Sequence, residues 1–169
     1  MKIFLDMDGT ICDWEGAVRK LGPDLVKGIG DTAKEEDVQA MCKAINEAGE
    51  NFWAEMDFAP DGRELWHIFR PFHPTILSSP GDFPDAAAGK LAWIRSHIPG
   101  TTLYLSKTKT EFIDPYDTSV LVDDNKNIIS AWEECGGIGI LHQSLENTEK
   151  QFLELLWNDP PDIDLKQHF

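Results

Sequence analysis

The chain has 169 residues and a formal net charge of −15, because 30 Asp and Glu residues outnumber 15 Lys and Arg residues. This acidic excess argues against nucleic-acid polymers and anionic membranes as partners, since both require a basic surface. No segment approaches the ~20 apolar residues of a membrane span, and the N-terminus lacks a signal-peptide pattern. We therefore expect a cytoplasmic protein made of one domain with a modest insertion.

The cysteines are few and far apart. Cys12, Cys42 and Cys135 are odd in number and form no Cys-x-x-Cys pair. This usage predicts buried, reduced thiols and argues against a disulfide framework or a zinc site. The five histidines also lack metal-ligand spacing, so we expect them to be structural or exposed.

A short apolar run at residues 1–5 predicts a buried strand, and Asp6-Met7-Asp8-Gly9-Thr10 follows it directly. Gly9 allows the backbone to turn sharply beside a bound anion. The two carboxylates do not open an EF-hand, because Ile11 and Ala17 stand where its Gly and Glu are needed. A solvated turn that caps the next helix remains the alternative.

The roughly fifty residues after this motif lack predicted strands. Asp13 is a candidate cap for a helix over residues 13–21, and Gly22-Pro23 ends it. Asp31-Thr32 can cap a longer helix, whose apolar residues recur at helical spacing until Gly49. An aromatic-rich bend over 51–58 and a helix over 62–70 follow. We expect a helical insertion in the position of a lid.

The rest of the chain alternates between strands and helices. Strands are predicted at 74–80, 101–105, 119–122 and 138–141, and helices at 90–97, 125–135 and 145–157. This alternation predicts an α/β fold: a Rossmann-like three-layer core with a mostly parallel sheet and a small helical cap inserted after the first strand. We assign residues 1–13 and 71–158 to the core, 14–70 to the cap and 159–169 to a loosely ordered tail.

Each of the first four predicted strands leads into residues that can do chemistry. In chain order these are Asp6 and Asp8, Ser78 and Ser79, Lys107 and Lys109, and Asp123 and Asp124. The ends of parallel strands meet at one edge of the sheet, so these groups should converge there.

Their chemistry fits a metal-assisted phosphoryl transfer. Packed carboxylates need a hard cation, and Mg²⁺ is usually held by one or two carboxylates, water and substrate phosphate. The Ser78 hydroxyl can bind phosphate oxygens, and a lysine can neutralise charge in the transition state. Asp6 can attack phosphorus to form an aspartyl-phosphate, while Asp8 acts as the general acid and base.

Simpler interpretations of these residues stay open. Asp123-Asp124 could only cap the helix after it. Lys107 and Lys109 cannot occupy the same place, so either one could be a solvated loop lysine. Lys90 lies inside a predicted helix, where a lysine is more often at the surface than in contact with a ligand.

Over nearly its whole length the chain resembles the haloacid dehalogenase-like hydrolase superfamily. The four motifs are Asp6-Met7-Asp8-Gly9-Thr10, Ile76-Leu77-Ser78-Ser79-Pro80, a lysine near 107–109, and Val120-Leu121-Val122-Asp123-Asp124. An Asp at position 8 is similar to the phosphatase branch of that superfamily. The resemblance implies Mg²⁺ as the cofactor.

A closer similarity is to 5′(3′)-deoxyribonucleotidases. It rests on residues 6–15, 51–55, 78–80, 90–93 and 105–110. It implies that Lys109 is the catalytic lysine and that Asp124, in preference to Asp123, binds the metal beside Asp6 and the Asp8 carbonyl. It adds Ser79, Lys90 and Lys107 to the candidate substrate-binding residues.

In that family aromatic side chains of the cap stack on the nucleobase, and the matching positions here are Trp14, Phe52 and Trp53. Stacking on a base contributes roughly 1–3 kcal/mol. The alternative for the adjacent Phe52 and Trp53 is ordinary core packing between helices.

The sequence thus predicts a Mg²⁺-dependent phosphatase for nucleoside monophosphates. Another small phosphate ester, such as a sugar phosphate, is the first alternative, because Asn125 stands where those nucleotidases carry a basic residue. A non-catalytic module that binds a phosphorylated ligand is the second.

Overall fold

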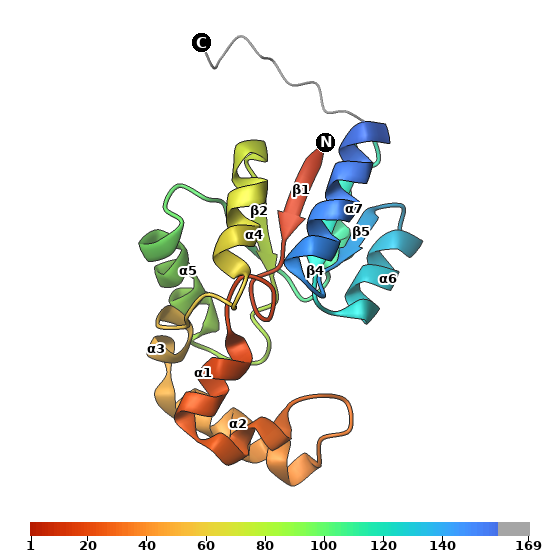
Figure 1. Cartoon of the computed structure of the whole chain (residues 1–169). Helices are drawn as coiled ribbons and strands as arrows, with labels where there is room; N and C mark the ends of the chain where they lie inside the picture. Colours follow the sequence, from red (N-terminus) through yellow and green to blue (C-terminus); the bar gives the residue numbers. More distant parts are fainter. Residues whose placement is uncertain (159–169) are drawn as a thin grey trace.

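Five short apolar segments form one parallel sheet in the computed structural model, which describes residues 1–158 (Figure 1). The strands are β1 (Lys2–Leu5), β2 (Thr75–Ser78), β3 (Leu103–Leu105), β4 (Ser119–Asp123) and β5 (Ile138–Leu141). Their order across the sheet is β3-β2-β1-β4-β5, and all neighbouring strands are parallel. The predicted α/β class is confirmed.

Helices connect the strands and cover both faces of the sheet. The α-helices are α1 (Trp14–Leu21), α2 (Glu35–Ala48), α3 (Glu50–Ala54), α4 (Gly62–Phe69), α5 (Ala86–His97), α6 (Lys126–Glu134) and α7 (Leu145–Asn158). Three short 3₁₀ turns are η1 (Pro23–Gly28), η2 (Arg70–Phe72) and η3 (Lys109–Phe112). Within the described residues no helix is long and apolar enough to cross a membrane.

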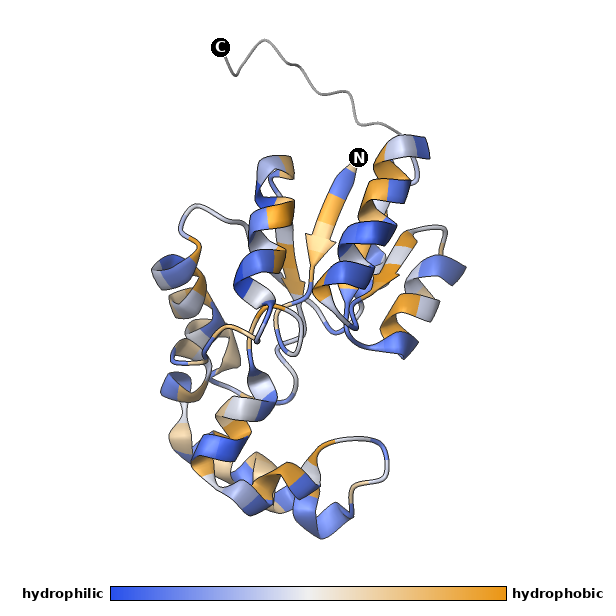
Figure 2. Cartoon of the chain, in the orientation of Figure 1, coloured by the Kyte–Doolittle hydropathy of each residue, from blue (hydrophilic) through white to orange (hydrophobic). Residues whose placement is uncertain are grey.

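Alternate residues of each strand pack on opposite faces, as the two-residue repeat of a strand requires. In β1, Ile3 and Leu5 join the larger core cluster together with Phe69 and Phe152 of α4 and α7. Phe4 joins the smaller cluster on the other face, with Trp132 of α6. Figure 2 shows the strands as the most apolar part of the chain, whereas the helices carry both apolar and polar residues along their length. Burial of these faces sets the register of the sheet.

Two local expectations are wrong. The second helix of the insertion begins at Glu35 after Lys34, and Asp31-Thr32 do not cap it. Residues 51–54, expected in a bend, lie in the short helix α3, which buries Phe52 and Trp53. The helix predicted to continue over 90–97 is confirmed and begins at Ala86. In each case tertiary packing extends or shifts what local propensity alone favours.

The insertion after β1 has two different packing partners. Helices α1 and α2 pack on η1 and on each other, and they lie beyond the carboxyl ends of the strands (Figure 1). Helix α4, which the sequence assigned to the 14–70 insertion, instead packs on α7, where the Phe69 and Phe152 ring centroids are 4.4 Å apart. The domain division stays a prediction. Because α4 packs on the core helix α7, this contact indicates that the cap ends before α4. The tail predicted for 159–169 lies outside the described residues.

The thiols are free, as expected, but only Cys12 is buried, while Cys42 is half-buried and Cys135 is exposed. The expectation of three buried thiols is therefore wrong for two of them. His142 is buried and structural, because its Nδ1 lies 2.9 Å from Thr148 Oγ1 and its Nε2 lies 3.4 Å from Asp61. It ties the start of α4 to α7.

Candidate active site

The loop after β1 brings its two carboxylates to the carboxyl edge of the sheet. The Asp6 amide continues the ladder to β4 by donating to the Val122 carbonyl at 2.9 Å. Gly9 then turns with φ of +80°, and a Cβ at this position would lie 2.4 Å from Asp124 Oδ2. Gly9 therefore lets the β1 loop approach the end of β4, as its place in the motif predicts.

Lys109 links the first and last of the four motifs. Its Nζ donates to Asp6 Oδ1 at 2.5 Å and to Asp123 Oδ2 at 2.6 Å, and its side chain is only 5% exposed. An ammonium group has three N–H donors, so one donor remains without a partner among the described residues. Lys109 holds the two carboxylates together and keeps one N–H for a further acceptor.

Lys90 links the first and second motifs. Its Nζ donates to Asp8 Oδ2 at 2.6 Å, to Ser78 Oγ at 2.8 Å and to the Ser79 carbonyl at 2.6 Å. Its side chain is fully buried, and the ammonium lies 5.0 Å from the centre of the Trp53 ring. All three donors are used. The simpler alternative of a surface lysine at this position is wrong, because this side of α5 faces the sheet edge.

Burial changes the acidity of this cluster. It raises the pKa of Asp8 to about 6, an effect that Lys90 opposes and Asp6 reinforces. It also raises the pKa of Asp123 to about 6, with Asp6 adding to the rise and Lys109 opposing it. Burial alone would lower the pKa of Lys109, but Asp6 and Asp123 raise it above its usual value. Asp8 thus titrates near neutral pH, while Lys109 stays charged.

Asp124 faces the same cluster from the start of the loop after β4. Its Oδ1 accepts a hydrogen bond from Thr10 Oγ1 at 3.2 Å, and its backbone N–H donates to the same hydroxyl. Burial and the charge of Asp6 raise its pKa. One carboxylate oxygen each of Asp6, Asp123 and Asp124 lie within 4.8 Å of one another.

This donor set fits a divalent cation. Oxygen ligands from carboxylates are what Mg²⁺ prefers. The carboxylates of Asp6, Asp8, Asp123 and Asp124 face the ammonium groups of only two lysines, which leaves two negative charges for a cation to balance. Asp6 and Asp124 are therefore suited as ligands, with Asp123 shared between the cation and Lys109. The Asp8 side chain is engaged by Lys90 instead.

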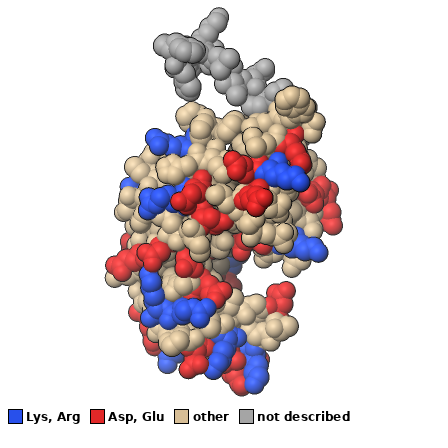
Figure 3. Space-filling view, viewed as in Figure 1, with Lys and Arg blue, Asp and Glu red and all other residues tan. Residues whose placement is uncertain are grey.

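A cavity of about 400 Å³ opens beside these carboxylates. Its lining includes Asp8, Gly9, Asp124 and, from α1, Trp14. Figure 3 shows the molecule hollowed between the core and the α1–α2 lobe. Of the three aromatic side chains predicted to stack on a base, Trp14 lines this cavity.

Phe52 and Trp53 do not line that cavity. They are 6% and 3% exposed, and their rings pack edge to face with centroids 4.9 Å apart. Trp53 also packs against Phe83, at 5.3 Å between ring centroids. The structure gives these two residues the core-packing role, because α3 lies against α5 rather than beside the opening.

A second cavity of about 340 Å³ lies on the other side of the motifs, lined by Ser79, residues 106–110 and the first turn of α6. Lys107 lies at its rim, 60% exposed, and pairs with Asp82. Lys109 is buried and reaches the carboxylates, whereas Lys107 does not contact them. Motif spacing did not decide which of the two lysines lies with the carboxylates, and the structure places Lys109 there.

The helix-cap interpretation of Asp123-Asp124 is wrong. Asn125 is the N-cap of α6, and its Oδ1 accepts hydrogen bonds from the amides of Asn127 and Ile128. Asp123 Oδ2 is directed at Lys109 instead. Asp13 does cap α1, as predicted, by accepting from the Gly16 amide at 2.9 Å.

The site contains one polar group that sequence reasoning did not single out. Thr10 is fully buried and orients Asp124 through its hydroxyl. Its position as the last residue of the Asp-rich motif was available as a signal, since buried hydroxyls need a partner. The burial of Lys90 could not be predicted from the sequence, because no local pattern in its helix indicates which side of the helix meets the sheet edge.

The fold resembles that of solved hydrolases. A hydrolase from Pseudomonas syringae aligns over 88% of both chains with a TM-score of 0.51 and 13% identity. A haloacid dehalogenase-like family hydrolase from Streptococcus pneumoniae aligns over 83% of both chains with a TM-score of 0.54 and 14% identity. Another hydrolase, from Streptococcus pneumoniae TIGR4, aligns over 90% of this chain and 97% of its own, again at 0.54 and 14%.

No family model and no curated protein matches the sequence. At such low identities the structural likeness establishes the fold alone, a parallel α/β fold that this chain shares with these hydrolases.

Proposed function

We propose that the protein is a phosphatase of the haloacid dehalogenase-like superfamily that hydrolyses small phosphomonoesters with the help of Mg²⁺. The observation that carries the proposal is the convergence of Asp6, Asp8, Asp124 and two buried lysines at one sheet edge. Bound there, Mg²⁺ would supply positive charge to neutralise the phosphate and align it for attack.

Asp6 is the proposed nucleophile. Lys109 engages its Oδ1, which leaves Oδ2 to attack phosphorus and form an aspartyl-phosphate. The remaining N–H of Lys109 is suited to a phosphate oxygen, whose negative charge it would stabilise as the leaving group departs.

Asp8 is the proposed general acid and base. Its Oδ2 is held by Lys90, whereas its buried Oδ1 accepts no hydrogen bond from any described residue. A pKa of about 6 lets it exchange a proton near neutral pH. It would protonate the leaving oxygen and later take a proton from the hydrolytic water. Lys90 acts as a positioning residue that aligns Asp8 with Ser78.

The proposed substrates are nucleoside monophosphates. This rests on the resemblance to deoxyribonucleotidases and on Trp14, whose side chain lines the cavity beside Asp8 and Asp124. Stacking on an indole is tolerant of the base and contributes roughly 1–3 kcal/mol. The acidic chain favours such a small molecule over a nucleic-acid polymer. Three unpaired thiols suit the reducing cytoplasm as its location.

The test measures phosphate release from 5′- and 3′-nucleoside monophosphates and from sugar phosphates, with Mg²⁺ or with EDTA. We expect Mg²⁺-dependent turnover that Asp6→Asn abolishes. Asp82→Asn is the matched control, because this exposed carboxylate pairs with Lys107 and with no other residue in 1–158, so the variant should keep full activity. Residual activity in Asp6→Asn would contradict the nucleophile assignment.

Trp14→Ala separates the substrate classes. If Trp14 stacks on a base, the KM for nucleotides should rise about tenfold while that for sugar phosphates changes little. Trp157→Ala, at an exposed residue of α7, is the control. Turnover confined to sugar phosphates would contradict the nucleotide assignment but support the phosphatase mechanism. Tight nucleotide binding without turnover would favour a non-catalytic binding module.

A further inference from the structure

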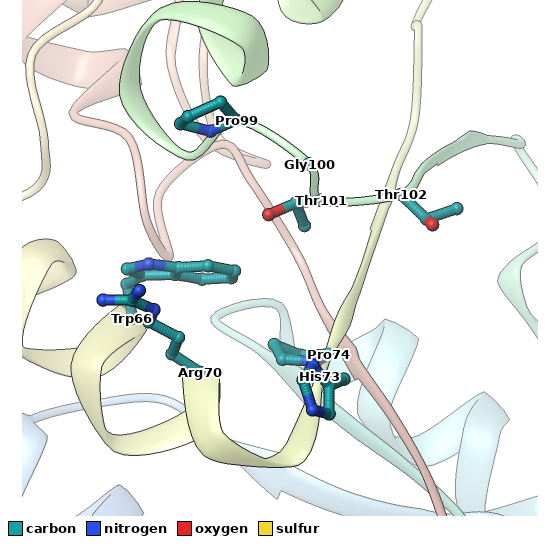
Figure 4. A pocket seen from close by; sticks show the side chains of 8 residues that line it. All are labelled: Trp66, Arg70, His73, Pro74, Pro99, Gly100, Thr101 and Thr102. Atoms are coloured by element: carbon teal, nitrogen blue, oxygen red, sulfur yellow. The ribbon is translucent and has the colours of Figure 1, made fainter.

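A third cavity, of about 340 Å³, lies at the opposite edge of the sheet from the candidate active site. One wall is formed by Trp66 of α4, by Arg70 at the C-cap of that helix, and by His73 and Pro74, which lead into β2. The other wall is residues 99–102, which lead into β3. Figure 4 shows the Trp66 ring and the residue 99–102 segment facing each other across the space. Its volume lies within the range of small-molecule sites.

The lining of this cavity is basic although the chain is strongly acidic. No Asp or Glu is among its eight lining residues, whereas the whole sequence has twice as many acidic as basic residues. Arg70 is exposed and makes no ion pair with any residue in 1–158, while most lysines in that range are paired. A guanidinium left unpaired beside a cavity is available to bind an anion through two parallel hydrogen bonds.

An aromatic surface lies next to this cation. Trp66 precedes Arg70 by one helical turn, so both project from the same side of α4 into the cavity (Figure 4). The indole is half-buried, which fixes its plane and leaves part of the ring accessible. Thr101 adds a hydroxyl from the facing segment, and Figure 4 shows that hydroxyl directed toward the indole side of the cavity.

The backbone at the cavity is also unusual. His73 has φ of +50° and is the one residue other than Gly with a positive φ among residues 1–158. A side chain in this left-handed conformation costs about 1 kcal/mol or more. His73 lies in the lining of the same cavity as Arg70. Strain of this kind concentrates at ligand sites.

This cavity is physically separate from the proposed catalytic centre. His73 and Pro74 precede β2, whereas Ser78 and Ser79 follow it. Five residues of extended chain from His73 to Ser78 span about 16 Å. A ligand here would leave the carboxylate cluster free.

We propose that the Trp66–Arg70–His73 cavity is a second binding site, which takes a planar aromatic molecule carrying one anionic group, a carboxylate or a phosphoryl group. The ring lies on the Trp66 indole, and the anion meets the Arg70 guanidinium, with His73 and Thr101 as further donors. The site does not depend on the proposed phosphatase activity.

The experiment titrates the full chain with 1-naphthoate and with 1-naphthylphosphonate, which cannot be hydrolysed, and follows backbone and indole N–H signals by NMR. We expect both probes, at submillimolar to millimolar concentration and in EDTA, to shift the signals of Trp66, Gly100 and Thr101. 1-Naphthoate should leave those of Gly9 and Asp124 in place, whereas the phosphonate can also shift them, because it resembles the substrates proposed for the catalytic centre. Inorganic phosphate and neutral naphthalene-1-carboxamide should bind at least about tenfold more weakly, because each lacks one of the two recognised features.

Arg70→Gln should weaken binding of both probes about tenfold or more. Arg95→Gln is the matched control, since Arg95 is also exposed and unpaired among the described residues but lies outside the cavity. Binding of one probe alone would identify its anion as the recognised group and support the site. The proposal is overturned if neither probe shifts these signals, if the shifts appear only at the carboxylate cluster, or if both Arg variants weaken binding equally.

Discussion

Lys109 occupies a position between carboxylates that a metal ion would also use. It donates to Asp6 and Asp123, two of the three residues whose oxygens gather within 4.8 Å. In the metal-free protein the ammonium is therefore the main counter-charge of this cluster. Removing one partner of a buried ion pair leaves the other uncompensated, at a cost of about 3–5 kcal/mol.

Lys109→Met should accordingly lower the melting temperature in EDTA and increase the rise in melting temperature that Mg²⁺ produces. The reason is that the carboxylates lose their internal cation and bind the added one more tightly. Thermal unfolding with and without Mg²⁺ measures both effects. Lys107→Met is the control, because its pair with Asp82 is exposed and contributes little. An unchanged Mg²⁺ response in Lys109→Met would contradict this account.

The raised pKa values of Asp8 and Asp123 predict a pH dependence of stability. Both are about 6 in the folded protein, against 3.8 for an unperturbed Asp. The folded state then binds more protons than the unfolded state between about pH 4 and 6, so its stability falls as pH rises through that window.

Metal-free protein should therefore be more stable at pH 5.5 than at pH 7.5, as chemical denaturation in EDTA can measure. Asp8→Asn removes one titrating group and should reduce this difference by about 0.5–1 kcal/mol, because pH 5.5 to 7.5 covers only the upper part of the window. Asp82→Asn should leave it unchanged, because Lys107 lowers the pKa of Asp82, so that group titrates below the window. Equal pH dependence in Asp8→Asn and the wild type would show that Asp8 is not the group responsible.

At the scale of elements, the contact between α3 and α5 positions Lys90. Gly89 lies at this contact, where an added Cβ would be 2.5 Å from both the Glu50 carbonyl and Trp53 Cβ. This close approach brings the Trp53 ring beside the Lys90 ammonium. The absence of a side chain at residue 89 thus lets α3 lie close enough to α5 to enclose Lys90.

Gly89→Ala provides a test in which two effects have opposite signs. Helix propensity alone would stabilise α5 by up to about 1 kcal/mol, whereas the clash with α3 should destabilise it by about 1–3 kcal/mol. We expect net destabilisation in urea unfolding. Ala88→Gly, at an exposed neighbour, measures the propensity term by itself. Net stabilisation of Gly89→Ala would mean that α3 and α5 are not closely packed.

At the scale of the whole molecule, the excess of negative charge acts against compactness. Acidic and basic side chains are interspersed on the face in Figure 3, and nine lysines and arginines of the described residues have carboxylate partners. The net charge of −15 nevertheless leaves an uncompensated repulsion. Salt screens exposed charges beyond about 10 Å at 0.1 M ionic strength.

The melting temperature in EDTA should therefore rise when NaCl is added from low ionic strength to physiological strength. Screening weakens the net repulsion more than it weakens individual surface pairs, each of which contributes little. Sucrose at matched osmolality is the control for effects unrelated to charge. A melting temperature that falls with NaCl would indicate that the surface ion pairs outweigh the net charge.

The sequence by itself determined the α/β fold and the convergence of the four motifs. Both follow from local patterns: short apolar runs form parallel strands, and parallel strands place their carboxyl ends at one edge. The position of Asp6, Asp8 and Asp124 there needed no knowledge of distant packing.

Only the tertiary structure decided which side chains are enclosed. Lysines have long flexible side chains, so the depth of Lys90 and the difference between Lys107 and Lys109 depend on elements far apart in the sequence. The burial of Phe52 and Trp53 depends on α3 meeting α5, and the Arg70 cavity depends on α4 meeting the segment before β3. Such contacts are set by how helices pack across the fold, which no local pattern in this chain records.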